Sequence, residues 1–259
     1  MASTQKYEYK SINDWLEDIV FRTAICFEAT ELIQLKRDYP PQLKGQPTVI
    51  ITADKANSWE PMTDIAKIGG VAQGKYTGIK LKAGAQPVDG LKELFSKEAV
   101  VNFDCNTSIR LIMLKALSDV TAAADFNAKF KGLQLGSEFV DKKFYPPYQV
   151  LKNNPGFTLI PGDWIEFVDL TVPAASGWQH ENSLYVGNGF FYAHLTTGKS
   201  GLYTEDQLNK LLNEESKTNG NNRARIDKLK DPGTGLAIKD PVTMEDWIST
   251  RISPTLFLK

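Results

Sequence analysis

The chain has 259 residues, of which 42% are hydrophobic and 24% charged, a composition typical of a globular protein with a sizeable core. Its 30 basic and 31 acidic residues nearly cancel, and no block of like charge favours nucleic acid or a membrane surface as a partner. Two cysteines argue against a disulfide scaffold, and two histidines make a zinc site an unfavoured interpretation. The start of the chain lacks the apolar run of a signal peptide and no run reaches transmembrane length, so we expect a cytoplasmic protein.

The first strong pattern is a long amphipathic helix, expected from Ser11 to Arg37. Its apolar residues fall close to one stripe, the pattern of a helix that packs one face on a core: Ile12, Leu16, Ile19, Val20, Ala24, Phe27, Leu32 and Ile33. A β-branched run at 48–52 then predicts a strand. Residues 54–90 are rich in Gly, Lys and Pro and predict loops, with at most a brief strand at 79–81.

The stretch from Ala99 to Leu117 organises the rest of the chain. Its opening apolar run predicts a strand, and the pattern that follows is apolar nearly all round, which predicts a buried helix. Residue types that cap helices stand at the start of this pattern: Asn106, Thr107 and Ser108. Cys105 is therefore expected at the helix N-terminus, where unpaired N–H groups and the helix dipole favour a thiolate. Most cysteines on apolar helices are small core residues, but the carboxylate of Asp104 is an unusual neighbour for a core thiol.

The remainder of the chain is expected to form short elements joined by loops. In order these are a helical region at 122–131, an aromatic loop at 139–151, a strand at 164–168, a hairpin at 182–195, a helix at 204–215 capped by Thr204 or Asp206, a mobile loop at 216–235, and a short helix and strand within 243–257.

The hairpin carries the second half of a candidate site. Asn188-Gly189 between two apolar runs is the strongest short-range hairpin signal. If these two residues form the turn, Ser183 faces His194, and Glu181 projects from the same face as Ser183, diagonal to His194. Glu181 and His194 would then converge on one spot, although a one-residue change in register would reverse this geometry. The alternative is that both are polar residues at a sheet edge near water.

Taken together, these motifs match a known plan. A Cys at the start of a buried helix, a "GDWIEF" strand and a "LYVGNGFFYAH" hairpin resemble the papain-like, NlpC-type cysteine hydrolases, but Glu181 stands where those enzymes have their catalytic His. The small bacterial spore-coat protein-glutamine γ-glutamyltransferases have that same replacement. Their first long helix, central helix, GD strand and Trp-x-x-Glu-Asn segment resemble "YEYKSINDWLEDIVFRTAICFEA", "NFDCNTSIRLIML", "PGDWIEF" and "GWQHENSLYVG". The resemblance spans residues 7–36 and 99–200, and 214–240 is interpreted as an insertion.

The resemblance implies a single α+β domain over residues 1–259 with a papain-like (NlpC-type) core. A central helix bearing the Cys would pack on an antiparallel β-sheet. The domain would comprise an N-terminal helix at 11–37, a core at 99–200, and a C-terminal helix and mobile loop at 204–259.

The resemblance also implies site residues. Cys105 would be the nucleophile and Glu181 the general acid/base. Asp104 would assist, with a reach one methylene shorter than the family's Glu, and His194 matches a family His near the site. Trp178 would form one wall of a substrate tunnel that excludes water. The facing wall would come from one of three aromatic residues: Tyr145, Tyr148 or Phe144.

The implied reaction is transfer of the acyl group of a protein glutamine through a Cys105 thioester to a lysine amine, forming an isopeptide crosslink. The partners would be proteins that supply Gln and Lys side chains, and neither a cofactor nor a metal is implied. Calcium is not indicated, because no acidic loop has ligand spacing. A carboxylate beside a thiolate is repulsive, so we expect a mostly protonated Cys105 at rest. The sequence does not indicate the oligomeric state.

Three other functions fit the sequence less closely. The first is a protein glutamine deamidase, which would use the same thioester. It would act as a toxin or delivered effector, whereas the crosslinking enzyme would act in sporulation and the spore coat. An NlpC-type peptidoglycan amidase or peptidase is disfavoured by Glu181 at the His position. A coat or scaffold protein that retains the fold without catalysis is the third.

Overall fold

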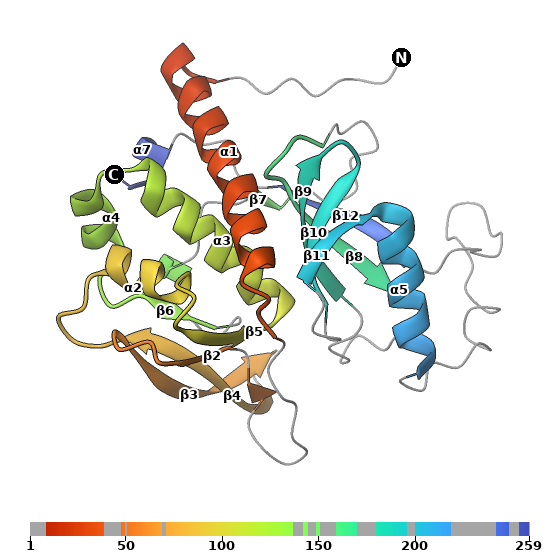
Figure 1. The fold of residues 1–259 in the computed structure, drawn as a ribbon, viewed down its shortest axis with the longest axis horizontal. Coiled ribbons are helices and arrows are strands. Elements are labelled where there is room, and N and C mark those ends of the chain that lie inside the picture. The colour runs from red at the N-terminus through yellow and green to blue at the C-terminus, as the bar shows by residue number, and fades with distance from the viewer. Residues whose placement is uncertain are drawn as a thin grey trace.

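The computed structural model of the chain places a helical layer beside an antiparallel sheet (Figure 1). The helix α3 (Cys105–Val120) runs through the middle of the helical layer, and α1 (Ile12–Gln34) packs along it. This arrangement confirms the predicted α+β class. The structure describes these residues: 9–38, 48–49, 51–68, 71–136, 142–144, 149–150, 159–169, 180–195, 200–218, 242–248 and 254–258.

A six-stranded antiparallel sheet forms the second layer, with the strand order β11-β10-β9-β8-β12-β7. Its strands are β7 (Gln149–Val150), β8 (Trp164–Asp169), β9 (His180–Gly187), β10 (Phe190–His194), β11 (Ser200–Thr204) and β12 (Val242–Ile248). The order brings the expected hairpin, β9–β10, next to the strand of the GDWIEF motif, β8. The sequence pattern did not predict β11, which lies at one end of this strand order.

The two faces of the sheet bury separate clusters. On the face toward α3, alternate strand residues join the main core: Trp164, Leu184 and Tyr192. On the other face, Leu208 and Leu212 of α5 (Glu205–Thr218) pack against residues of β8 and β10.

A capping box begins α5. The side chain of Thr204 accepts a hydrogen bond from Gln207 N, and the side chain of Gln207 accepts one from Thr204 N. The predicted Thr204 cap is therefore confirmed.

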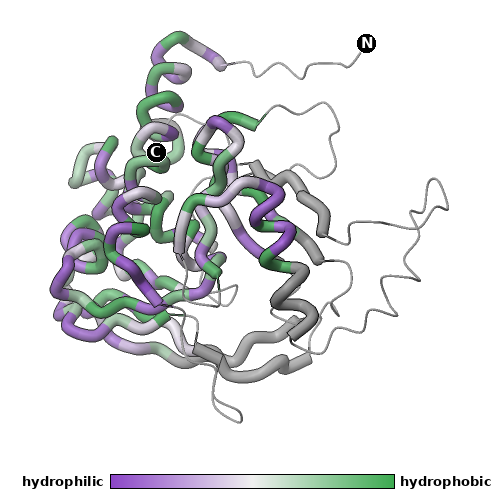
Figure 2. The backbone as a smooth tube through the Cα atoms, turned by 45° about the vertical axis from the view of Figure 1, so that its right-hand side comes forward, coloured by the Kyte–Doolittle hydropathy of each residue, from purple (hydrophilic) through white to green (hydrophobic). Residues whose placement is uncertain are grey.

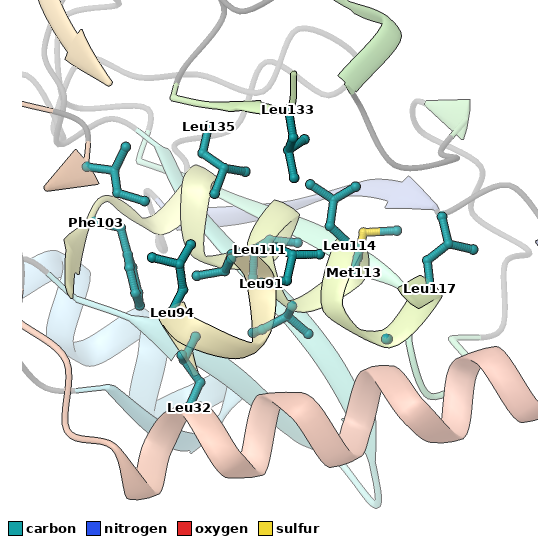
Figure 3. Close-up of a cluster of buried hydrophobic side chains, with 14 of the residues drawn as sticks. Leu32, Leu91, Leu94, Phe103, Leu111, Met113, Leu114, Leu117, Leu133 and Leu135 are labelled. Carbon is teal, nitrogen blue, oxygen red and sulfur yellow. The ribbon is translucent and has the colours of Figure 1, made fainter. Parts of the chain in front are cut away.

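The main core surrounds α3, as the leucine-rich close-up in Figure 3 shows. Leucines from α2 (Pro87–Leu94), from α3 and from the short strand β6 (Gln134–Leu135) meet there, together with Leu32 of α1 and Phe103 of β5 (Val100–Phe103). Two further elements close this side of the core: α4 (Ala123–Lys129) and α7 (Pro254–Leu258). The predictions of a buried helix after a strand and of a helical region near 122–131 are confirmed.

One prediction for the first hundred residues is wrong and another is confirmed with a difference. The segment predicted as loops contains a long antiparallel hairpin, β3 (Trp59–Ile68) and β4 (Val71–Leu81), followed by α2. Its lysines and glycines dilute the apolar alternation that would reveal strands. The strand predicted at 48–52 is confirmed in its described residues, which belong to two short strands: β1 (Thr48–Val49), which pairs with β4, and β2 (Ile51–Asp54), which pairs with β5.

The buried face of α1 also differs from the predicted stripe. Ile12, Leu16 and Phe27 are among the exposed residues, and Figure 2 shows hydrophobic residues along the end of α1 that projects from the body. The buried face carries charged groups beside apolar ones: Asp18, Phe21, Arg22, Ile25, Glu28, Ala29 and Leu32. Periodicity favours the most apolar stripe, and it misses a face whose charges are paired within the protein.

Among the described residues, no helix is both long and apolar enough to cross a bilayer.

A buried ion cluster explains how charged residues occupy that face. Arg22 Nη1 lies 2.7 Å from Asp163 Oδ1, and Arg22 Nε lies 2.8 Å from Asp18 Oδ2. Arg22 Nη1 also donates to Pro161 O at 3.2 Å. Gly162 has a φ of +90°, and a Cβ there would lie 3.1 Å from Arg22 Cγ, so both backbone conformation and space favour glycine. The cluster ties α1 to the Gly-Asp turn that precedes β8.

A second buried carboxylate on α1, that of Glu28, is expected to make the stability of the fold depend on pH. Glu28 is 3% exposed and lies 3.5 Å from Lys115 Nζ of α3. Burial, with the nearby Asp119 carboxylate, raises the pKa of Glu28 from 4.5 to about 7. The folded state therefore binds more protons than the unfolded state between these values, and stability is lost as the pH rises through about 7. Wild type is therefore expected to lose about 2 kcal/mol more of its free energy of unfolding than Glu28→Gln does as the pH rises from 5 to 8. Urea unfolding at the two pH values measures this, and parallel pH dependences would contradict it.

Candidate functional site

Cys105 is the first residue of α3 and lies at its buried N-terminus, 8% exposed. The cap of this helix is Asp104, whose Oδ1 accepts a hydrogen bond from Thr107 N at 2.7 Å. Asn106, Thr107 and Ser108, the residues with capping side chains in the sequence, all lie inside the helix. The cap is one residue before the Cys because the backbone of Asp104 is extended, with φ −80° and ψ 171°.

The β9–β10 hairpin brings the second half of the site to this helix end. Asn188 and Gly189 both have positive φ, 51° and 75°, which confirms the two-residue turn. The predicted pairing of Ser183 with His194 is wrong, because the register shifts between Phe190 and Phe191 and Ser183 pairs with Ala193.

Glu181 and His194 nevertheless meet across the two strands. The carboxylate of Glu181 accepts a hydrogen bond from the backbone N–H of His194, at 3.3 Å. Glu181 is 5% exposed and its charge acts on Cys105. The structure therefore brings Glu181 and Asp104 to Cys105.

The environment of Cys105 disfavours its thiolate. Burial raises the pKa of the Cys105 thiol well above its ordinary value, and the carboxylates of Glu181 and Asp104 raise it further. Hydrogen bonds from the backbone and side chain of Asn182 oppose this rise. The helix N-terminus at Cys105 does not outweigh these effects, and a neutral thiol is the resting form at neutral pH, in agreement with the expectation from the sequence.

Asn182 is a residue of the site that sequence reasoning missed. Its Nδ2 donates to Cys105 Sγ at 3.5 Å, and its Oδ1 accepts from Trp164 Nε1 at 2.8 Å. Both Asn182 and Trp164 are buried. The signal available in the sequence was the position of Asn182 next to Glu181, at the start of a predicted strand.

His194 is fully buried, between an aromatic ring and a serine hydroxyl. Its ring lies 4.6 Å from that of Phe103 between centroids, and its Nδ1 contacts Ser200 Oγ. Burial lowers the pKa of His194 to about 4, so the imidazole is neutral at neutral pH. A neutral ring does not supply the imidazolium that stabilises a thiolate in a Cys–His pair.

The predicted aromatic walls are only partly described. Trp178, Tyr145 and Tyr148 lie outside the described residues. Phe144, the third candidate for the facing wall, is 2% exposed and packs within the main core. In the described part of the chain, no group of three His, Cys, Asp or Glu side chains is arranged to hold a metal ion.

The two roles open to Asp104, capping and proton transfer, predict different behaviour for two variants. Asparagine caps as well as aspartate does, so we expect Asp104→Asn to keep wild-type stability, whereas Asp104→Ala loses about 1 kcal/mol. Removing the charge also removes a carboxylate that disfavours the thiolate, so the pKa of Cys105 falls in both variants. Thermal unfolding and thiol alkylation against pH measure the two effects. Equal stability of the two variants would contradict the capping role.

Comparisons with known proteins identify the family from the sequence. The family of protein-glutamine γ-glutamyltransferases (TGL) matches residues 72–233, which include Cys105, Glu181 and His194. Protein-glutamine γ-glutamyltransferases of Bacillus cereus strain B4264 and Bacillus anthracis strain A0248 are each 30% identical over 138 residues, which is 53% of this chain and 47% of theirs. The chain thus spans about half the length of the curated relatives it matches.

A solved structure shows the same fold over nearly the whole chain. The transglutaminase from Geobacillus stearothermophilus, without its C-terminal extension, superposes with a TM-score of 0.64 at 19% identity, covering 96% of this chain and 97% of that one. The helix bearing Cys105 and the antiparallel sheet beside it are consistent with the papain-like core expected for that fold. Because the family match covers more than half of the residues, the chain belongs to the bacterial protein-glutamine γ-glutamyltransferase family.

Proposed function

We propose that the chain catalyses calcium-independent transfer of a protein glutamine acyl group to a lysine amine, with Cys105 as the nucleophile and Glu181 as the general acid/base. The observation that carries this proposal is the buried thiol at a helix N-terminus beside two carboxylates, Glu181 and Asp104. The family membership supports the reaction type. A setting in the spore coat or as a delivered effector stays a prediction.

The first half-reaction forms the thioester. Sγ of Cys105 attacks the carboxamide carbon of the substrate glutamine while the S–H proton passes to Glu181. The carbonyl electron pair moves to the oxygen, then returns as the C–N bond breaks. The leaving nitrogen takes the proton from Glu181 and departs as ammonia. Because the thiol is neutral at rest, proton transfer accompanies attack.

The second half-reaction reverses the roles of the same groups. A lysine amine attacks the thioester carbon, Glu181 accepts a proton from the nitrogen, and the S–C bond breaks. The sulfur leaves with the proton that Glu181 returns to it, which restores the resting thiol. Water in place of the amine gives glutamate, so the yield of crosslink depends on how well the site excludes water.

The test is incorporation of a biotinylated primary amine into casein with a calcium chelator present, with ammonia release recorded in parallel. Cys105→Ala is expected to lower amine incorporation more than about a thousandfold, because the variant lacks the thiol proposed to form the thioester. Cys26→Ala is the matched control, because Cys26 is the second cysteine and lies on α1. It is expected to keep wild-type rates.

Four results would contradict the proposal in different ways. Ammonia release without amine incorporation would identify a deamidase. Activity that appears only when calcium is restored would contradict calcium independence. Equal rates for Cys105→Ala and an active wild type would exclude the Cys105 thioester, and the absence of both amine incorporation and ammonia release in wild type would favour a scaffold that retains the fold.

A further inference from the structure

The orientation of the Asn182 amide follows from its partners. The indole N–H of Trp164 can only donate, so the Asn182 atom that faces it, at 2.8 Å, is the carbonyl oxygen. The other end of the amide, Nδ2, therefore faces Cys105 Sγ, at 3.5 Å. Asn182 is 7% exposed and Trp164 is 2% exposed, so water has little access to the pair.

This orientation decides which way the thiol proton points. An amide NH2 only donates, so the Cys105 sulfur is the acceptor in that contact and its own S–H must be donated elsewhere. The ionisable groups that act on the thiol are Glu181 on β9, Asp104 before α3 and Tyr192 on β10. Each of the two carboxylates accepts one backbone N–H, Asp104 that of Thr107 and Glu181 that of His194, and each keeps acceptor sites for a further proton. Of the two, Glu181 acts more strongly on the thiol, which makes it the stronger candidate to receive the S–H proton.

We propose that Asn182, held in place by Trp164, is a positioning residue that directs the S–H proton of Cys105 to Glu181 and stabilises the sulfur as it loses that proton. The inference deepens the proposed function and rests on it. The S–H bond breaks, the proton joins a Glu181 oxygen, and a sulfur electron pair forms the bond to the glutamine carbonyl carbon. The Asn182 N–H bond to sulfur remains in place and strengthens as negative charge develops there.

The experiment compares Asn182→Ala, Trp164→Phe and Trp59→Phe in a Cys26→Ser background, so that only Cys105 is alkylated. Trp59→Phe is the matched control, because Trp59 is also a buried tryptophan, 4% exposed, whose Nε1 donates to Gly90 O at 3.0 Å. Two quantities are measured for each variant. One is the pH midpoint of iodoacetamide alkylation, and the other is kcat and KM for amine incorporation.

We expect the alkylation midpoint of Asn182→Ala to rise by about one pH unit and kcat to fall at least about tenfold, with KM nearly unchanged. Trp164→Phe is expected to shift both in the same direction by less, since the amide keeps its donor but loses its anchor. Trp59→Phe is expected to match wild type. A purely structural role for the pair would change stability without moving the alkylation midpoint.

Two results separate this inference from the proposed function. If wild type transfers amine but neither Asn182→Ala nor Trp164→Phe moves the alkylation midpoint relative to Trp59→Phe, the inference is overturned and the proposed function stands. If wild type transfers no amine while the midpoint shifts as expected, the transferase proposal fails and the role of Asn182 at the thiol stands. Should Asn182→Ala fail to fold, the comparison of Trp164→Phe with Trp59→Phe decides.

Discussion

Replacing Glu181 with glutamine is expected to lower kcat for amine incorporation by about a thousandfold while making Cys105 easier to alkylate. Glutamine keeps an oxygen that can accept the His194 backbone N–H, which Glu181 accepts at 3.3 Å, so the strands keep their contact. The variant loses the proton acceptor and donor of both half-reactions. It also loses a charge that disfavours the thiolate, so the pKa of Cys105 falls. Steady-state kinetics and the pH midpoint of alkylation measure the two effects.

The two effects have opposite signs, which distinguishes this site from a Cys–His pair. In a Cys–His pair, removing the imidazolium raises the pKa of the thiol, so reactivity and activity fall together. Glu28→Gln is the matched control, since Glu28 is an equally buried glutamate on α1 and is expected to leave kcat unchanged. A Glu181→Gln variant with a raised alkylation midpoint would contradict the Cys–Glu pair.

Replacing Arg22 with methionine is expected to lower the free energy of unfolding by about 3–5 kcal/mol. Arg22 pairs with Asp18 and Asp163, and their side chains are 7%, 2% and 0% exposed. Removing the guanidinium leaves two buried carboxylates without their cation, and this cost greatly exceeds that of losing a pair in water. Equilibrium unfolding in urea at pH 7 measures the change.

A surface ion pair in the same chain provides the control for this prediction. Lys80 and Glu60 lie 3.2 Å apart with their side chains 44% and 43% exposed, so Lys80→Met is expected to cost less than about 1 kcal/mol. A loss for Arg22→Met no larger than that for Lys80→Met would contradict the view that the cluster fixes α1 to the Gly-Asp turn.

The sequence predicted those parts of the fold that local rules determine. The apolar pattern after Cys105 is uninterrupted enough to mark a buried helix, and Asn188-Gly189 permits the positive φ that its turn requires. The β3–β4 hairpin was missed because lysines and glycines interrupt the alternation of apolar and polar residues that marks a strand. The two strands are defined by backbone pairing with each other, and β4 also pairs with β1 and β6. The buried face of α1 was missed because Arg22 is satisfied by Asp163, a residue 141 positions away.

The sequence proposed the residues of the candidate site but only part of their geometry. Cys105 and Glu181 came from motif order, and in the structure the charge of Glu181 acts on the Cys105 thiol. The pairing of Ser183 with His194 failed because a one-residue register shift leaves no trace in the spacing of the hairpin. The role of Asn182 could not be read from the sequence, because it depends on Trp164 and Cys105 meeting on either side of one amide.

The most direct test of the central claim is to trap the thioester. Wild type is incubated with a glutamine peptide in the absence of amine, quenched in acid, digested and examined by mass spectrometry. We predict a peptide acyl group, attached with loss of ammonia, on the fragment that contains Cys105, and its accumulation is expected to be much slower in Glu181→Gln. An acyl group on Cys26, or ammonia release without any acyl group on Cys105, would contradict the mechanism.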